Sequence, residues 1–204
     1  MDNPILDVYY DNKNKASDIY LKYLTKDCEE NGIIVRVFDN KVDWLNTDSG
    51  HGELFLEPCF ADEGLKDTDI NVDKDSATAT GIYNYITENY PNRDKIIMVI
   101  GRGLVGKQLI DKLIVYGYSI IEINSKTDKN QLYAMAYYNA DIIVGLAESE
   151  KPIFGDAFSN HLRKKKVVLI DAVNNFDTED KFRCGKWTRK VIINRVWENY
   201  EKMR

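Results

Sequence analysis

The sequence is poor in the side chains that most often hold metals or form disulfides. Its 204 residues include two histidines, His51 and His161, and three cysteines, Cys28, Cys59 and Cys184, with no C-x-x-C pair. A structural zinc site needs about four such ligands at short spacings, so we expect no metal site. A sparse, odd set of thiols fits a reducing compartment, and we expect a cytoplasmic protein.

Long apolar runs and an excess of positive charge are also missing. No stretch reaches the length of a membrane span, and the chain opens without the apolar segment of a signal peptide. The net charge is −5 at pH 7, and no basic stripe with interleaved aromatic residues is present. We therefore expect that the protein binds neither membranes nor nucleic acids.

One segment carries the clearest functional signal. Residues 95–117 read KIIMVIGRGLVGKQLIDKLIVYG, an apolar run followed by G-x-G-x-x-G and a helical pattern. In this context the glycine pattern predicts dinucleotide binding, and an ordinary glycine-rich turn is the alternative. Gly101 would make the tight turn, Gly103 would let a pyrophosphate approach the backbone, and Gly106 would let the helix pack on the strand. The predicted cofactor contacts here are Gly101, Arg102, Gly103, Leu104, Val105 and Gly106.

The next apolar segment bears on the kind of cofactor. An acidic residue at the end of this second strand would accept the ribose hydroxyls of NAD, but Glu122 lies a little inside the strand. The tip that follows is neutral and basic, with Asn124, Ser125, Lys126 and Thr127. Such a tip suits the 2′-phosphate of NADP, to which Arg102 would add a bidentate contact. We predict NADP first and NAD second; solvent exposure without a ligand is the alternative.

Apolar and amphipathic segments alternate along the second half of the chain. Strands are expected at 95–100, 119–123, 141–146 and 167–171, and helices at 104–116, 129–138 and 187–201. Repeated βα units with continuous apolar strands predict an α/β fold with a Rossmann-like doubly wound parallel sheet.

The first residues predict a smaller N-terminal α/β lobe. We expect strands at 5–10, 33–38 and 53–56, and a helix that begins with Ser17 as its N-cap and is closed by Gly32. Residues 39–51 and the acidic stretch 61–76 are expected to be loops, and a helix at 78–90 ends before Pro91. The expected domains are a substrate lobe at 1–76, a cofactor-binding domain at 77–186, and a C-terminal helix at 187–204 that packs back between them.

Nearly the whole chain carries, in order, the motifs of one enzyme family. Residues 17–33 resemble its S-x-x-Y-x-x-x-K-x-K-x-x-x-E-x-G-I helix, residues 52–58 its G-I-L-V-Q-L-P strand, and residues 101–107 its G-R-S-x-x-V-G-x-P loop, one residue shorter. Further matches are residues 66–69 with K-D-V-D, 78–81 with C-T-P-x-G, 124–127 with H-S-x-T, 140–144 with A-D-I-V-V, 170–175 with V-I-D-V-G-I-N, and 185–188 with G-P-x-T. The sequence thus resembles the bifunctional methylenetetrahydrofolate dehydrogenase/cyclohydrolases, the FolD family.

The chain departs from this family where the cyclohydrolase step depends on side chains. The family lysine four residues after the helix tyrosine is Leu24 here, and the glutamine that supports it is Leu56. Lys22 and Lys26 are two residues away, roughly 200° around a helix, so neither points the same way. The chain also lacks the PVPGG segment before the last helix, an opening helix, and a helix between residues 40 and 52.

The resemblance implies a function and a substrate site. It implies an NADP-dependent methylenetetrahydrofolate dehydrogenase without cyclohydrolase activity, a folate-like small-molecule substrate, and a homodimer. Tyr20 would lie against the folate, and Asp69 would bind the pterin, since one carboxylate can accept two N–H bonds. The alternatives are a half-buried helix residue for Tyr20 and one more loop charge for Asp69. For the protein, they are a redox enzyme acting on a non-folate imine or cyclic aminal, and a non-catalytic nucleotide-binding protein.

Overall fold

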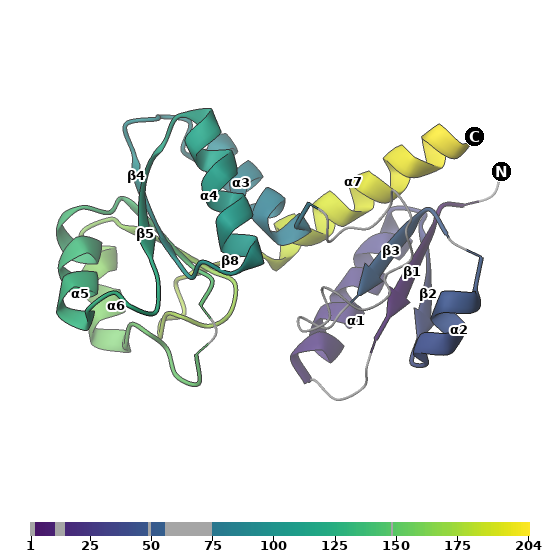
Figure 1. Ribbon diagram of the computed structural model, residues 1–204, viewed down its shortest axis with the longest axis horizontal. Coiled ribbons are helices and arrows are strands. Elements are labelled where there is room, and N and C mark those ends of the chain that lie inside the picture. Colours follow the sequence, from purple (N-terminus) through teal and green to yellow (C-terminus); the bar gives the residue numbers. More distant parts are fainter. Residues whose placement is uncertain (1–2, 11–14, 49, 56–74, 148) are drawn as a thin grey trace. The chain divides into compact units, whose positions relative to one another are not determined.

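The chain forms two compact units (Figure 1). The computed structural model describes residues 3–10, 15–48, 50–55, 75–147 and 149–204, and of residues 15–17 and 55 only the backbone. Unit 1 comprises Met1–Ala77 and Arg189–Arg204, and unit 2 comprises Thr78–Thr188.

Unit 2 is built on a parallel sheet with the strand order β5-β4-β6-β7-β8. The strands are β4 (Ile96–Ile100), β5 (Ser119–Ile123), β6 (Ile142–Gly145), β7 (Val168–Asp171) and β8 (Phe182–Arg183). The helices are α3 (Ala77–Asn89), α4 (Leu104–Tyr116), α5 (Lys129–Tyr138) and α6 (Asp156–Lys164). Helices α3 and α4 cover one face of the sheet, and α5 and α6 cover the other (Figure 1). The predicted Rossmann-like doubly wound sheet is therefore confirmed.

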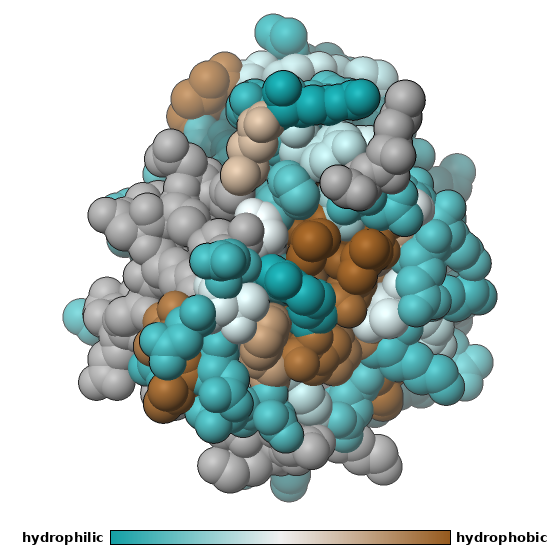
Figure 2. Space-filling view, turned by 90° about the vertical axis from the view of Figure 1, so that its right-hand side faces the viewer, coloured by the Kyte–Doolittle hydropathy of each residue, from teal (hydrophilic) through white to brown (hydrophobic). Residues whose placement is uncertain are grey.

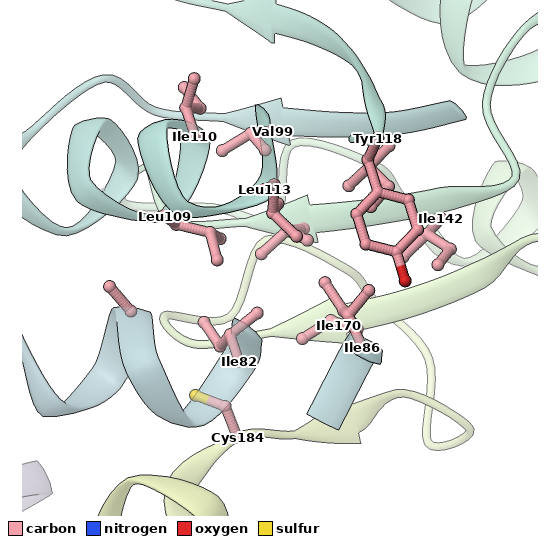
Figure 3. Close-up of a cluster of buried hydrophobic side chains, with 13 residues drawn as sticks. Ile82, Ile86, Val99, Leu109, Ile110, Leu113, Tyr118, Ile142, Ile170 and Cys184 are labelled. Atoms are coloured by element: carbon pink, nitrogen blue, oxygen red, sulfur yellow. The ribbon is translucent and has the colours of Figure 1, made fainter. Parts of the chain in front are cut away.

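Alternation along the strands explains why helices cover both faces. In β4, Ile97 and Val99 pack against α3 and α4, whereas Met98 and Ile100 pack toward α5 and α6. Figure 3 shows the first of these cores, where Leu109 and Leu113 of α4 meet the strands. A fully buried aliphatic side chain contributes about 1.5–3 kcal/mol, so a strand that is apolar at every position is stable only with both faces covered.

Unit 1 has a smaller parallel sheet with the order β2-β1-β3. Its strands are β1 (Ile5–Tyr9), β2 (Ile34–Phe38) and β3 (Gly52–Phe55), and its helices are α1 (Lys15–Glu30), α2 (Lys41–Asn46) and the part of α7 (Gly185–Met203) that begins at Arg189. Leu6 and Val8 of β1 pack with Leu24 of α1 and Val196 of α7 in one core. The predicted smaller α/β lobe is thus also confirmed.

The other face of this sheet carries a buried ion pair. Asp7, at the centre of β1, has no exposed surface. Its carboxylate accepts hydrogen bonds from Arg36 Nε at 2.6 Å and Arg36 Nη2 at 2.7 Å, and from the Gly50 amide at 2.8 Å. Because Asp7 and Arg36 are register partners in β1 and β2, the pair fixes the alignment of the two strands.

The edge of unit 1 leaves some apolar side chains at the surface. Ile34 and Val37 of β2, which is at an edge of the described sheet, are 47% exposed, and Val42 of α2 is 59% exposed. Figure 2 shows hydrophobic residues among hydrophilic ones on a face of this unit.

Four local expectations were wrong. Helix α1 begins at Lys15, so Ser17 lies inside it and is not its N-cap. Residues 41–46 form helix α2 in the stretch expected to be a loop without a helix. Its cap is Asn40, whose side chain accepts a hydrogen bond from the Val42 amide at 2.9 Å, and Trp44 anchors it in the core. Helix α6 and the two-residue strand β8 were also missed. Gly32 does follow the end of α1, with φ of +70°, as predicted.

We predict that Asp7→Ala destabilises unit 1 by about 3 kcal/mol, because it leaves the guanidinium of Arg36 without its buried partner. The estimate is at the low end for broken buried pairs, since the Arg36 side chain is 34% exposed and can be rehydrated. Urea unfolding followed by tryptophan fluorescence measures this, because Trp44 and Trp197 lie in unit 1. Lys26→Ala, which removes an exposed pair with Glu30, is the control and should change stability by about 0.5 kcal/mol or less. Equal effects of the two substitutions would contradict the assignment.

Candidate functional site

The glycine loop lies at the topological switch point of the unit 2 sheet. Strand β4 has β5 on one side and β6 on the other, and the helices that follow β4 and β5 cover opposite faces. Ligands of such sheets bind outside the carboxyl ends of the strands at this point. A Cβ atom added to Gly101, directly after β4, would lie 2.8 Å from the Ala147 amide nitrogen that follows β6. The loops after β4 and β6 are therefore in contact where a dinucleotide is expected.

The three glycines of the loop fill different geometric needs. Gly101 has φ of +106°, which favours glycine, and its backbone lies against residues 146–147. A Cβ on Gly106 would collide with the Gly101 carbonyl, so only glycine lets α4 begin this close to β4. Gly103 has an ordinary φ of −68°, and a Cβ there would meet nothing within 4 Å. The fold needs no glycine at position 103, whereas an approaching pyrophosphate would, so the loop fits the dinucleotide that the motif predicts.

The start of α4 is suited to an anion. Gly103 is its N-cap, and the first amide that bonds within the helix is that of Lys107, which donates to the Gly103 carbonyl at 3.0 Å. The amides of Leu104, Val105 and Gly106 precede it and have no acceptor within the helix. In the described chain no side chain caps this end and no acidic residue lies in the first turn. The positive end of the helix dipole is thus available to a phosphate.

The tip after β5 is a tight turn. The Thr127 amide donates to the Asn124 carbonyl at 3.0 Å, and the Lys126 amide donates to Asn124 Oδ1 at 2.9 Å. Asn124 and Thr127 therefore hold the turn together, while Ser125 and Lys126 lie exposed at its centre. Ser125 and Lys126 have no side-chain role in the described turn, so their side chains are free to turn toward a ligand.

Arg102 and Glu122 form an ion pair that was not predicted from the sequence. Arg102 Nε lies 3.2 Å from Glu122 Oε2, and the two side chains are 61% and 37% exposed. The register explains the contact, because Glu122 lies beside Val99 of β4, two residues before the loop. The guanidinium that we assigned to a 2′-phosphate is thus bound to a carboxylate.

A buried polar network supports the loop after β6. Asn175 has no exposed surface, and its side-chain amide makes two hydrogen bonds with the backbone of Ala147. Its Oδ1 accepts from the Ala147 nitrogen at 3.1 Å, and its Nδ2 donates to the Ala147 carbonyl at 2.6 Å. The Asn175 amide in turn donates to Asp171 Oδ1 at 2.8 Å, and Lys181 Nζ lies 2.8 Å from Asp171 Oδ2. The sequence analysis missed Lys181, because no periodic or motif signal separates it from the other lysines of the chain.

The predicted substrate residues lie in unit 1 or outside the described residues. Tyr20 is half-buried on α1 against the unit 1 core, and the guanidinium of Arg189 lies 6.0 Å from its ring centroid. Leu24 has no exposed surface and packs in the same core. Asp69 and Leu56 lie outside the described residues. The roles of Tyr20 and Asp69 stay predictions.

Other chemistry finds little support among the described residues. Burial raises the pKa of Cys28 to about 12 and that of Cys184 to about 11, so both thiols stay protonated at neutral pH. In this part of the chain no group of three His, Cys, Asp or Glu side chains could hold a metal ion. No described helix is both long and apolar enough to cross a membrane.

We predict that Gly103→Val weakens binding of nicotinamide dinucleotides roughly tenfold or more, because its side chain fills the space of the pyrophosphate. Its melting temperature should stay close to that of the wild type, since a Cβ there meets no atom. Gly106→Ala is the matched contrast: its methyl group collides with the Gly101 carbonyl, so the melting temperature should fall as well. Calorimetric titration and thermal melts measure both. Unchanged affinity of Gly103→Val would contradict the loop assignment.

No protein-family model and no curated protein matches the sequence. The fold nevertheless matches solved structures over nearly its whole length. The methylenetetrahydrofolate dehydrogenase-cyclohydrolase (FolD) of Trypanosoma brucei, complexed with NADP cofactor and inhibitor, is similar with a TM-score of 0.69 and 13% identity, over 98% of this chain and 87% of that chain. The NAD-dependent 5,10-methylenetetrahydrofolate dehydrogenase of Saccharomyces cerevisiae has a TM-score of 0.69 and 13% identity, over 98% of this chain and 88% of that chain.

A further match is an enzyme named for a different substrate. Quinate dehydrogenase of Corynebacterium glutamicum in complex with NAD has a TM-score of 0.59 and 12% identity, over 99% of this chain and 100% of that chain. Identities this low show the fold alone. The resemblance found in the motifs is confirmed at that level: the chain has the fold of the methylenetetrahydrofolate dehydrogenase/cyclohydrolases.

Proposed function

We propose that the protein is a nicotinamide-dependent oxidoreductase that oxidises methylenetetrahydrofolate and lacks cyclohydrolase activity. The observation that carries this proposal is the glycine loop at the switch point of the unit 2 sheet, with Gly103 open to a ligand and the start of α4 uncapped. The motifs along the chain and its fold support the choice of substrate. Unit 2 would bind the cofactor and unit 1 the folate.

The loop residues would hold the cofactor. The amides at the start of α4 would bind the pyrophosphate, and Ser125 and Lys126 at the tip after β5 would lie near the adenosine ribose. When bound, the nicotinamide ring supplies the hydride acceptor of the reaction.

The chain itself then has to position the substrate. The C–H bond that breaks is next to nitrogen, and the lone pair of that nitrogen assists the departure of the hydride. No side chain has to take or give a proton, so the task of the protein is to orient the donor carbon and exclude water. We propose that the ring of Tyr20 lies against the folate and that Asp69 accepts N–H bonds from the pterin.

The same argument supports the loss of the cyclohydrolase step. Hydrolysis needs a group that moves protons, and the residue at the position of the family lysine is Leu24, buried among apolar side chains. A lysine at this position would have to leave the core of unit 1 to reach a substrate. The homodimer and the cytoplasmic location stay predictions from the sequence.

We predict that the purified protein forms reduced nicotinamide when it is mixed with methylenetetrahydrofolate and NAD or NADP, which absorbance measures. Gly103→Val is the matched control: it should keep its fold, and at cofactor concentrations well below saturation its turnover should fall roughly tenfold or more, because its side chain fills the space of the pyrophosphate. No absorbance change with either cofactor, at high enzyme concentration, would remove the proposed function.

A second candidate is a redox enzyme that acts on a non-folate imine or cyclic aminal. The fold is compatible with a substrate other than a folate, because a quinate dehydrogenase shares it. Binding of a nicotinamide cofactor, measured by calorimetry, without oxidation of the folate would support this second candidate or the non-catalytic nucleotide-binding alternative.

We predict that Leu24→Lys does not restore cyclohydrolase activity and lowers stability by about 3 kcal/mol or more, because it buries a charge in the core of unit 1. Leu24→Met keeps the volume and apolar character, and should lose less than about 1.5 kcal/mol. Urea unfolding and the hydrolysis rate of methenyltetrahydrofolate measure the two effects. A stable Leu24→Lys protein that hydrolyses the methenyl form would contradict both parts.

A further inference from the structure

We propose that the ion pair between Arg102 and Glu122 makes the protein select NAD over NADP. This inference rests on the proposed function, because it assigns the adenosine end of the same cofactor site. It reverses the order of cofactors that the sequence predicts, and the reason is a contact that the sequence does not show.

Glu122 is placed where it can meet the adenosine ribose. In β5, Ile120 packs on the side of α3 and α4 and Ile121 on the side of α5 and α6. Side chains alternate along a strand, so Glu122 lies on the same side as Ile120, which is the side covered by α4. It is the next-to-last residue of β5, roughly 20 residues after the glycines, where an acidic residue binds ribose hydroxyls in dinucleotide-binding folds.

The guanidinium of Arg102 is held by this carboxylate. The Nε–Oε2 distance of 3.2 Å joins the glycine loop to the end of β5, the two segments that flank the adenosine ribose in this fold. Lys126 and Lys107 are the other cations nearest in sequence to these two segments, and both lie on the surface. A ribose bound between these two segments would therefore lie beside the Glu122 carboxylate and the guanidinium paired with it.

The charges of the two cofactors then decide the selection. The ribose of NAD carries a 2′-hydroxyl, which can donate a hydrogen bond to Glu122 while Arg102 keeps its ion pair. The 2′-phosphate of NADP brings negative charge against the Glu122 carboxylate and can gain Arg102 only if the existing pair breaks. Both effects weaken NADP relative to NAD. Selection thus comes from a repulsive carboxylate as well as from an attractive hydrogen bond.

Binding titrations test the inference without any turnover. We expect wild-type protein to bind NAD roughly tenfold or more tightly than NADP by calorimetry, and 5′-AMP more tightly than 2′,5′-ADP. In Glu122→Gln, NADP and 2′,5′-ADP should tighten and the preference should shrink roughly tenfold, because the carboxylate is gone and Arg102 is released. The double variant Arg102→Ala with Glu122→Gln should lose that gain for the 2′-phosphates. Glu88→Gln, an exposed residue of α3, is the matched control and should leave the ratio unchanged.

The outcomes separate this inference from the proposed function. An exposed ion pair contributes little to stability, so the melting temperature of Glu122→Gln should match that of the wild type. Equal or tighter binding of NADP by the wild type, or an unchanged ratio in Glu122→Gln, overturns the inference and leaves the proposed function in place. Failure of the wild type to bind either dinucleotide overturns both.

Discussion

Helix α4 begins so close to the end of β4 that only a hydrogen atom fits on Gly106. A Cβ there would collide with the Gly101 carbonyl, and a Cβ on Gly101 would press on the backbone after β6. These two contacts fix the loop against its own sheet, and the amides at the start of α4 have no acceptor within the helix. The shape of the candidate site therefore follows from packing between backbones, before any ligand is present.

The polar network behind the loop extends this constraint to the neighbouring strands. Asn175 binds both backbone groups of Ala147, and Asp171 holds Asn175 and Lys181. The Asp171 and Lys181 side chains are nearly inaccessible, so loss of one partner would leave a buried charge unpaired. The carboxyl end of the sheet is thus held in one arrangement, as a site needs when it works by positioning.

Sequence reasoning predicted several parts of the structure that have a period, although it missed the amphipathic helix α6. Helices α4 and α5 and strand β5 begin and end at the predicted residues, because apolar repeats and glycines mark their ends. Helix α2 has only six residues and no such repeat, and its one buried anchor, Trp44, gives no pattern. Strand β8 is two residues long, and only pairing with β7 defines it.

In the candidate site, too, some features could be predicted from the sequence and others could not. The positions of Gly101 and Gly106 could be predicted because backbone geometry demands glycine there, whatever the neighbours are. The contact between Arg102 and Glu122 could not, since it needs the register of β4 with β5 as well as two rotamers. Each residue stands out by itself in the sequence, but only the pairing of β4 with β5 brings the two side by side.

The sequence identity between this chain and structures of its fold is low. Constraints from backbone geometry and constraints from individual side chains explain which features of the fold can still be recognised. Main-chain cradles depend on a few glycines and on strand order, so they survive when most side chains change. Substrate contacts depend on individual side chains, and at the position that the resemblance aligns with the family lysine the chain has Leu24, which lies in the core of unit 1. Under the proposed function, the backbone of the glycine loop would hold the cofactor, whereas the choice of the other substrate would depend on individual side chains of unit 1.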